Sequence, residues 1–218
     1  GNYSDNEDML DLNEGEYNSK LGVELIEEFK NCFNENNNNG MDGIKMEIKY
    51  KDVVKLGRTH IQDAVPIMFG QEVSGWRASL ENAKAMIELA ATTLYTSSFG
   101  ATAVGTGSTC PLKKGYAKYA CEALNKVLKT NKYKVTPNLF QSTWSKDQFV
   151  FVSGAIKALA MNLYKISQDV RFLASGPRSG FGEINIPQNE PGSSIMPGKV
   201  TPTQAEAVTM ACLRVFAN

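Results

Sequence analysis

The 218-residue sequence contains a single histidine, His60, and only four cysteines. The cysteines show no CxxC pair and no zinc-finger spacing, and one histidine cannot complete a metal site built on imidazoles. Four cysteines in a chain of this size are also too few for a fold stabilised by disulfides. The sequence therefore predicts no metal centre and a protein of a reducing compartment.

An excess of charge of one sign and long apolar runs are also missing. The formal net charge at pH 7 is zero, which argues against a broad basic surface for nucleic acid. No apolar run approaches the ~18 residues of a membrane-spanning helix, and the first ten residues lack a signal-peptide layout. We expect a soluble protein without a nucleic-acid or membrane partner. Because the chain begins without Met, we also expect it to be processed or cut from a longer protein.

The first forty residues differ in composition from the rest of the chain. They hold ten Asp or Glu against two Lys, a net charge of −8, and ten Asn that include the run Asn36–Asn39. Such a segment buries too little apolar surface to offset its ordering entropy, so we interpret its ends as loop or disorder around a short helix at Leu21–Phe29. The remaining residues carry a net charge of +8, which suits an anionic substrate without identifying one.

Two segments show the apolar repeat of long helices, with spacings that alternate between three and four. The first contains Val73, Trp76, Leu80, Ala83, Ile87, Ala90 and Leu94, and the second contains Phe149, Val152, Ile156, Leu159, Leu163, Ile166, Val170 and Leu173. This pattern predicts shallow-angle packing in a bundle. A shorter helix at about 116–128 and a C-terminal helix from about 202, with Thr201 as its N-cap and Pro202 as its first residue, complete an all-α architecture.

Strand patterns are scarce, and the last helix is unusually apolar. Only Ile44–Tyr50 alternates apolar and polar residues, which indicates a strand or an irregular edge. The C-terminal helix is apolar on more than one face, which predicts burial all round. Long helices this apolar favour partner chains, so we expect an oligomeric helical bundle.

A connection of about 26 residues, 175–200, joins the second long helix to the last one, which is well beyond the usual loop length. Its end combines Ser193, Ser194 and Lys199 with flexible glycines and leads directly into a helix. Backbone N–H groups there, together with the ammonium group, suit a carboxylate or phosphate. The alternative is a glycine-rich surface loop whose serines only cap turns.

Two other segments carry candidate chemistry. His60 lies among polar residues shortly before the first long helix; a lone histidine is more often a structural hydrogen-bonding residue, but an adjacent carboxylate would orient it for proton transfer. The Gly100–Gly107 segment is no P-loop, because no Lys follows its second glycine. We interpret it as a helix terminus and tight turn with threonines available to a ligand.

Taken together, three runs of sequence resemble one family. GRTHIQDAVPIMFGQEVSGW, ATAVGTG and SGPRSGFGEINIPQNEPGSSIMPGKVTPTQAE are similar to class II fumarate hydratase, in the superfamily of aspartase and argininosuccinate lyase with its GSxxMxxKxN signature. The resemblance spans about residues 54–218. It implies the central helical lyase domain, preceded by a divergent N-terminal segment at 1–53 and cut before the last helix and the C-terminal domain. His60 after Thr59 favours fumarase over aspartase.

The resemblance also implies site residues. Ser193 matches the family's catalytic base, which acts as an alkoxide and therefore needs N–H groups and a cation nearby. His60 matches the residue that handles the hydroxyl or water, oriented by a carboxylate at the position of Glu206. The positions that match substrate contacts are Thr59, Ser194, Lys199, Val200 and Thr201. No cofactor and no metal are implied.

Two departures from the family pattern bear on activity. Thr201 stands where the signature has asparagine, so an amide donor to substrate is missing, at a cost of ~1.5–3 kcal/mol for a hydrogen bond to a charged group. An upstream SSN-type motif is absent from residues 1–53.

We therefore expect a lyase, a hydro-lyase of the fumarate hydratase type, that reversibly hydrates fumarate to L-malate through an aci-carboxylate intermediate. The resemblance implies a homotetramer with shared sites, a place in the tricarboxylic acid cycle, and a location in the cytoplasm or the mitochondrial matrix. The alternatives are a catalytically incomplete fragment or pseudoenzyme that keeps the oligomerisation core, and an aspartase-type ammonia lyase.

Overall fold

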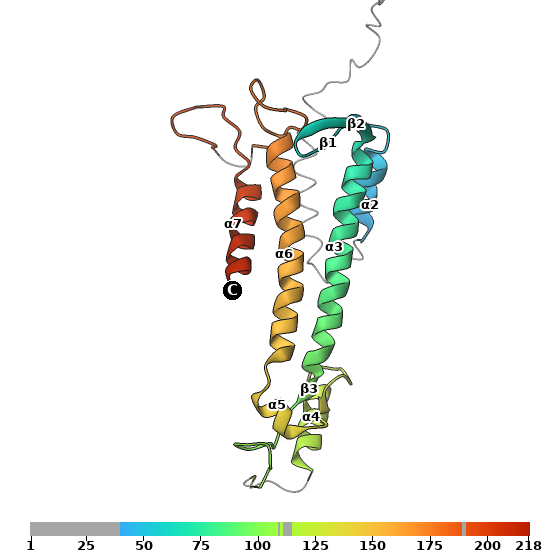
Figure 1. The fold of residues 1–218 in the computed structure, drawn as a ribbon, viewed down its shortest axis with the longest axis vertical. Coiled ribbons are helices and arrows are strands. Elements are labelled where there is room, and N and C mark those ends of the chain that lie inside the picture. The colour runs from blue at the N-terminus through green and yellow to red at the C-terminus, as the bar shows by residue number, and fades with distance from the viewer. Residues whose placement is uncertain (1–39, 109, 111–114, 189–190) are drawn as a thin grey trace, which may run out of the picture. The chain divides into compact units, whose positions relative to one another are not determined.

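The structure, a computed structural model, describes residues 40–108, 110, 115–188 and 191–218 (Figure 1). The acidic Asn-rich start, with the helix expected at Leu21–Phe29, lies outside the described residues. In chain order the elements are α2 (Gly40–Lys49), β1 (Val54–Thr59), β2 (Gln62–Met68), α3 (Phe69–Ala91), the 3-10 helix η1 (Thr92–Tyr95), β3 (Thr96–Ser97), α4 (Tyr116–Val127), β4 (Lys134–Val135), α5 (Leu139–Trp144), α6 (Asp147–Leu173) and α7 (Thr203–Ala217). The described residues form two compact units: those up to residue 80 together with those from 160 onward form the first, and those between 81 and 159 form the second.

In the first unit the long helices lie side by side and run antiparallel (Figure 1). The Trp76 indole of α3 donates a hydrogen bond to the Asp169 carboxylate of α6 at 3.1 Å, and the Asn162 amide of α6 donates to the Ser79 carbonyl at 2.9 Å. On the other flank of α6, the Tyr164 ring meets the Phe216 ring of α7 with centroids 5.9 Å apart. The fold is predominantly helical, as expected for a bundle, and α3 and α6 confirm the two long helices that the apolar spacing predicts.

The core of the first unit lies at the end of α3 and α6 that carries the hairpin β1–β2. Its buried residues are Met46, Tyr50, Phe69, Val73, Trp76, Ile166, Val170, Leu173 and Ile184. Gly70 brings α2 close to the start of α3, because a Cβ at this position would lie only 2.6 Å from the Glu47 carbonyl. The core therefore fixes the segments before and after the long helices against one another.

The interpretation of Ile44–Tyr50 as a strand is wrong, because this segment belongs to α2 and the turn that follows it. Met46 and Tyr50, four residues apart on one helix face, are 3% and 2% exposed, whereas Ile44 and Ile48 are exposed. Only two of the four alternating apolar residues, Met46 and Tyr50, therefore face the core. Their spacing of four residues matches one face of a helix, so the alternating segment forms a helix.

The start of the last helix also differs from the expectation. The N-cap of α7 is Pro202 rather than Thr201, and no side chain caps the helix. The Thr201 hydroxyl instead donates a hydrogen bond to the Gly192 carbonyl at 3.1 Å. The predicted N-cap of Thr201 is therefore wrong, because the hydroxyl closes the preceding loop instead.

The second unit is small and packs tightly around short side chains. Strands β3 and β4 are parallel, with Thr96 opposite Lys134. The Asn125 side chain of α4 both donates to and accepts from the Tyr133 backbone, at 2.9 and 3.0 Å. The buried residues include Ala83, Ala90 and Ala101, which lets the backbone segments approach closely.

Apolar surface remains open along α6 and α7. By length and composition alone, α6 is long and apolar enough to cross a membrane, and 17% of its most apolar window is buried inside the chain. Met161 on α6 is 56% exposed, and Met210 and Leu213 on α7 are 60% and 53% exposed. The expected burial of α7 all round is therefore not reached within one chain.

Candidate active site

His60 lies at the turn of a hairpin that the sequence analysis did not predict. Strands β1 and β2 are antiparallel, and Thr59 lies opposite Gln62, so His60 and Ile61 alone form the turn. Both have left-handed backbones, with φ of 53° and 64°, as two-residue hairpin turns require. Asn-Gly is the usual pair at these positions, and a β-branched residue in this conformation is strained. The imidazole is thus presented to solvent on a short, sterically restricted turn.

A cluster of four charged side chains supports this hairpin. Lys55 Nζ lies 2.6 Å from Glu72 Oε2 and 3.4 Å from Glu183 Oε2, the latter without hydrogen-bond geometry. Arg58 forms an ion pair and hydrogen bond with Glu183 Oε1. Positive and negative groups alternate along the chain of contacts, so the cluster is neutral and joins β1 to α3 and to the loop after α6.

The cluster changes the titration of its own members. Burial alone would raise the pKa of the Glu183 carboxyl, but the hydrogen bond from Arg58 and the charge of Lys55 outweigh it, so this pKa lies below its ordinary 4.5. The hydrogen bond to Glu183 raises the pKa of the Arg58 guanidinium despite partial desolvation. The Arg58 guanidinium also stacks on the Phe181 ring, with its Cζ 4.3 Å from the centroid. Glu183 and Arg58 therefore both remain charged at neutral pH.

The loop that carries Ser193 is closed on itself. A Cβ at Gly192 would lie 2.1 Å from the Lys199 carbonyl oxygen, so only glycine fits. The Thr201 hydroxyl holds the Gly192 carbonyl from the other side, and the Lys199 N–H donates to the Met196 carbonyl at 3.2 Å. These contacts form a tight, nearly closed turn.

Ser193 is the focus of this turn. Its Oγ accepts hydrogen bonds from the backbone N–H groups of Ile195 at 3.2 Å and Met196 at 3.1 Å. Two donors on one oxygen stabilise negative charge there more than they stabilise the neutral hydroxyl. The donors come from the turn after Ser193 rather than from the N-terminus of α7, which the sequence analysis proposed.

The other sequence-predicted residues of this loop are accessible. Ser194, Lys199 and Val200 are exposed, and Thr201 is half-buried. No ion pair involves Lys199 in the part of the chain that the structure describes. Its ammonium group is therefore available to an anionic ligand.

Glu206 lies in the first turn of α7, and its Oε1 is 3.9 Å from the Arg171 guanidinium of α6. Among the described residues of this single chain, no hydrogen bond or ion pair joins Glu206 to His60. The hairpin and the Ser193 loop both belong to the first unit, but no hydrogen bond or ion pair among the described residues joins their catalytic candidates.

The Gly100–Gly107 segment belongs to the second unit. The N–H groups of Gly105 and Gly107 both donate to the Ala101 carbonyl, at 3.1 and 3.0 Å, which confirms a tight turn. It ends no helix, however, because β3 rather than a helix precedes it. Gly105 is required because a Cβ there would lie 2.8 Å from the Phe140 Cα. The observed glycines thus serve close backbone packing.

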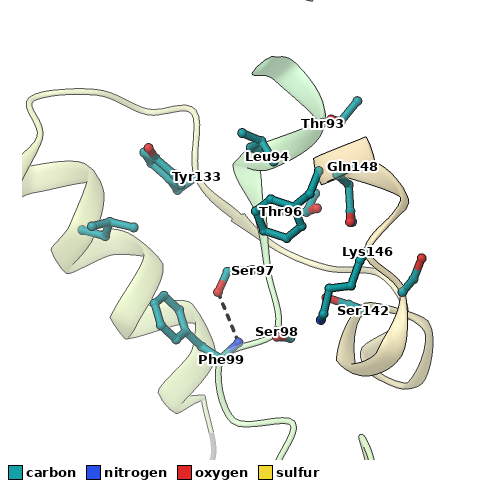
Figure 2. Close-up of a pocket in the computed structure, with 13 residues that line it drawn as sticks. Thr93, Leu94, Thr96, Ser97, Ser98, Phe99, Tyr133, Ser142, Lys146 and Gln148 are labelled. Carbon is teal, nitrogen blue, oxygen red and sulfur yellow. Dashed lines mark hydrogen bonds between the residues drawn. The ribbon is translucent and has the colours of Figure 1, made fainter. Parts of the chain in front are cut away.

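The second unit also contains a cavity of about 350 Å³ (Figure 2). It is lined by Thr93, Leu94, Thr96, Ser97, Ser98, Phe99, Leu124, Tyr133, Ser142, Ser145, Lys146, Gln148 and Phe149. No residue in the predicted site set lines it. No local sequence pattern reveals it, because its polar wall combines short segments that come before and after α4 in the chain. Ser97 and Ser145 already have partners, in the Phe99 N–H and the Asp147 carboxylate.

The described residues include three free cysteines, of which Cys110 is partly exposed. No group of three His, Cys, Asp or Glu side chains there could hold a metal ion. Cys121 and Cys212 are buried free thiols, and burial raises the pKa of both.

Comparison with known proteins places these features in a wider context. A family model described as lyase matches residues 37–217. Class II fumarate hydratase of Brucella suis is 48% identical over 172 residues, which is 79% of this chain and 36% of that protein. The protein of the same name from Myxococcus xanthus is 50% identical over 169 residues, 78% of this chain and 36% of the relative.

Solved structures agree with the sequence matches. Recombinant class II fumarase from Schistosoma mansoni has a TM-score of 0.76 to this chain, with 36% identity, over 79% of this chain and 39% of that one. A fumarate lyase:delta crystallin structure from Brucella melitensis has a TM-score of 0.75 with 39% identity, over 80% of this chain and 37% of that one. The chain therefore spans a little over one third of the length of these relatives.

Proposed function

Because the chain belongs to the lyase family, with class II fumarate hydratases among its relatives, we propose that it carries part of a site for the reversible hydration of fumarate to L-malate. The observation that supports this best is the double hydrogen bond of the Ile195 and Met196 N–H groups to Ser193 Oγ. A hydroxyl so placed can exist as the alkoxide that proton abstraction from carbon requires.

In the dehydration direction the alkoxide of Ser193 takes the proton from the carbon next to the substrate carboxylate. The electron pair moves into that carboxylate, which becomes the aci-carboxylate dianion. Lys199, with no ion-pair partner among the described residues, stabilises the added charge. Ser194, Val200 and Thr201 complete the contacts to the carboxylate.

The leaving hydroxyl departs as water after it receives a proton. We assign this step to His60, with Thr59 as a neighbouring substrate contact. Both are exposed, so they are accessible to a substrate. A positioned acid or base of this kind contributes about 10²–10⁴ in rate. Glu206, on α7, is assigned as the carboxylate that orients the imidazole of another copy.

The relationship to the lyase family also leads us to propose how the chain assembles. No hydrogen bond or ion pair joins His60 to Glu206 among the described residues of one chain, and exposed apolar side chains run along α6 and α7. A homotetrameric bundle covers these faces and brings the hairpin of one subunit to the Ser193 loop of another. Burial in such a bundle also accounts for the apolar character of α6 without a membrane. A soluble tetramer in the cytoplasm or the mitochondrial matrix, acting in the tricarboxylic acid cycle, is the setting we propose.

The test is the rise of fumarate's ultraviolet absorbance when the purified chain is given L-malate, with L-aspartate in parallel. Appearance of fumarate from L-malate alone supports the hydratase. Appearance from L-aspartate alone contradicts it and identifies an ammonia lyase.

A second candidate is a catalytically incomplete form that keeps the assembly core and binds a dicarboxylate. One observation favours it: Thr201 replaces the asparagine of the family signature. A folded oligomer that binds fumarate without turnover of either substrate would establish this alternative.

A further inference from the structure

Arg58 links the hairpin that carries His60 to a partly buried contact outside the hairpin. It precedes His60 by two residues, and its side chain is 13% exposed where it meets the 22% exposed side chain of Glu183. One flank of its guanidinium stacks on Phe181, and its Nε is buried without a hydrogen-bond partner among the described residues. The position of the Arg58 side chain therefore depends on the Glu183 carboxylate and the Phe181 ring.

Glu183 is itself fixed to the bundle. Its backbone N–H donates to the Leu173 carbonyl at the end of α6, at 2.9 Å, and the next N–H, of Ile184, donates to the same carbonyl at 3.3 Å. The Ile184 side chain is 5% exposed and belongs to the core. Glu183 thus presents its carboxylate from a backbone anchored twice, ten residues before Ser193.

Apart from the support by Arg58, few interactions of the described residues fix the turn at His60 and Ile61. His60 and Ile61 are exposed and left-handed, and neither side chain makes a hydrogen bond or an ion pair in the described part of the chain. Strained backbone persists only where its surroundings determine it. The ladder of β1 and β2 supplies one constraint, with a register irregularity between Leu56 and Arg58, and the Arg58–Glu183 contact supplies another.

We propose that Arg58 and Glu183 are positioning residues for the reaction, which hold the His60 turn against the segment that leads to Ser193. The inference rests on the proposed hydratase function. Neither residue touches substrate. Their contact keeps the imidazole in the orientation from which it delivers its proton, and Lys55 holds the second oxygen of Glu183 in place.

The experiment compares two substitutions in the full chain, in the oligomeric state that it adopts. Arg58→Lys keeps the positive charge but loses the planar fork and the stacking, and Glu183→Gln keeps the shape but loses the negative charge. Glu88→Gln is the matched control, because Glu88 forms an exposed ion pair with Lys84 at 3.9 Å. Glu183→Asp, which keeps the charge and shortens the reach, replaces Glu183→Gln if that variant does not fold.

Two readouts are combined. One is kcat and KM for L-malate; the other is the imidazole NMR signal of the chain, which reports on His60 alone because no other histidine exists. We expect kcat to fall about 10²-fold, the loss typical of an ångström-scale misplacement, with a much smaller change in KM and a shifted or broadened His60 signal. The double variant Arg58→Lys/Glu183→Gln loses no more than the worse single variant, because both break one contact.

The outcomes separate the two proposals. An unmoved His60 signal, or a kcat no lower than that of Glu88→Gln, overturns the positioning role, and so does additive loss in the double variant. A wild-type chain that turns over no L-malate overturns the hydratase. In that case, a His60 signal that shifts in Arg58→Lys but not in Glu88→Gln still supports the role of Arg58 in fixing the turn at His60.

Discussion

Thr201 and Gly192 are nine residues apart, and the Thr201 hydroxyl donates a hydrogen bond to the Gly192 carbonyl at 3.1 Å. This contact closes the loop around Ser193 at its two ends. The departure from the family signature at position 201 therefore has a structural role of its own, separate from any contact with substrate.

Replacing Thr201 by Val removes the donor while it keeps the shape of the side chain. We expect the loop to loosen by about 1 kcal/mol, the net value of a hydrogen bond, and turnover to fall. Thr201→Asn and Thr201→Ser keep a donor and preserve the closed loop. Amide hydrogen exchange across residues 192–201 measures the closure, and equal exchange in Thr201→Val and Thr201→Ser would contradict it.

Gly192→Ala is expected to open the same loop. Its Cβ would lie 2.1 Å from the Lys199 carbonyl, so the backbone must move and the donors to Ser193 move with it. Turnover should be lost while the helix content measured by circular dichroism stays at the wild-type level. Gly75→Ala is the control: it lies in the interior of α3, meets nothing within 4 Å and should stabilise the helix by about 0.5–1 kcal/mol. Retained activity in Gly192→Ala would show that the closed loop is dispensable.

Ser193→Ala is expected to abolish turnover of L-malate and leave the thermal unfolding temperature unchanged. The Ile195 and Met196 N–H groups that lose their acceptor are in exposed residues, so water replaces it. Ser74→Ala is the control, because the Ser74 hydroxyl also makes an exposed hydrogen bond, to the Gln71 carbonyl at 2.7 Å. Unchanged turnover in Ser193→Ala would exclude Ser193 as the base.

Glu183→Gln should lower stability in a pH-dependent way. Although burial opposes ionisation, Arg58 and Lys55 hold the folded pKa of Glu183 below its ordinary 4.5. The carboxylate therefore contributes stability that is present above pH 4.5 and is lost as the pH falls through the folded pKa. The unfolding free energies of wild type and variant, measured in denaturant, should differ at neutral pH and converge in acid. A difference that does not change with pH would show that Glu183 acts through shape alone.

Met161→Glu tests the proposed assembly. Met161 is 56% exposed on α6 within one chain, and a charge there is costly only if another chain covers it. We expect the variant to dissociate into smaller species, as measured by light scattering after size-exclusion chromatography. Asn82→Glu, at an exposed polar position of α3, should keep the wild-type mass. An unchanged mass for Met161→Glu would place this side chain outside any interface.

The long helices were predictable because their signal is repeated. Eight apolar residues at spacings of three and four specify α6 almost to its ends. The same rule specifies α3, but Leu94, the last residue of that repeat, lies in η1. The segment 44–50 misled because an alternation of period two also places residues 46 and 50 on one helix face. Which period applies depends on what the segment packs against, and α2 packs against the start of α3.

The hairpin and its charge cluster were not predictable from local patterns. Strand β2 is exposed at nearly every position, so it has no alternation, and its turn lacks the usual Asn-Gly pair. Arg58 and Glu183 are 125 residues apart, and nothing near either one specifies the other. In contrast, the N–H donors to Ser193 were foreseeable from its glycine-rich loop, although their source was not.

The left-handed turn at His60 and Ile61 limits how this protein can change by mutation. At most sites of an enzyme a residue is retained either for its chemistry or for its shape. Under the proposed mechanism, position 60 must satisfy both, since its replacement has to transfer a proton and tolerate a positive φ. Position 61 has only the second requirement, so Gly, Asn or Asp there should relieve strain. Stabilising substitutions near this site are therefore expected at residue 61 before any other position of the hairpin.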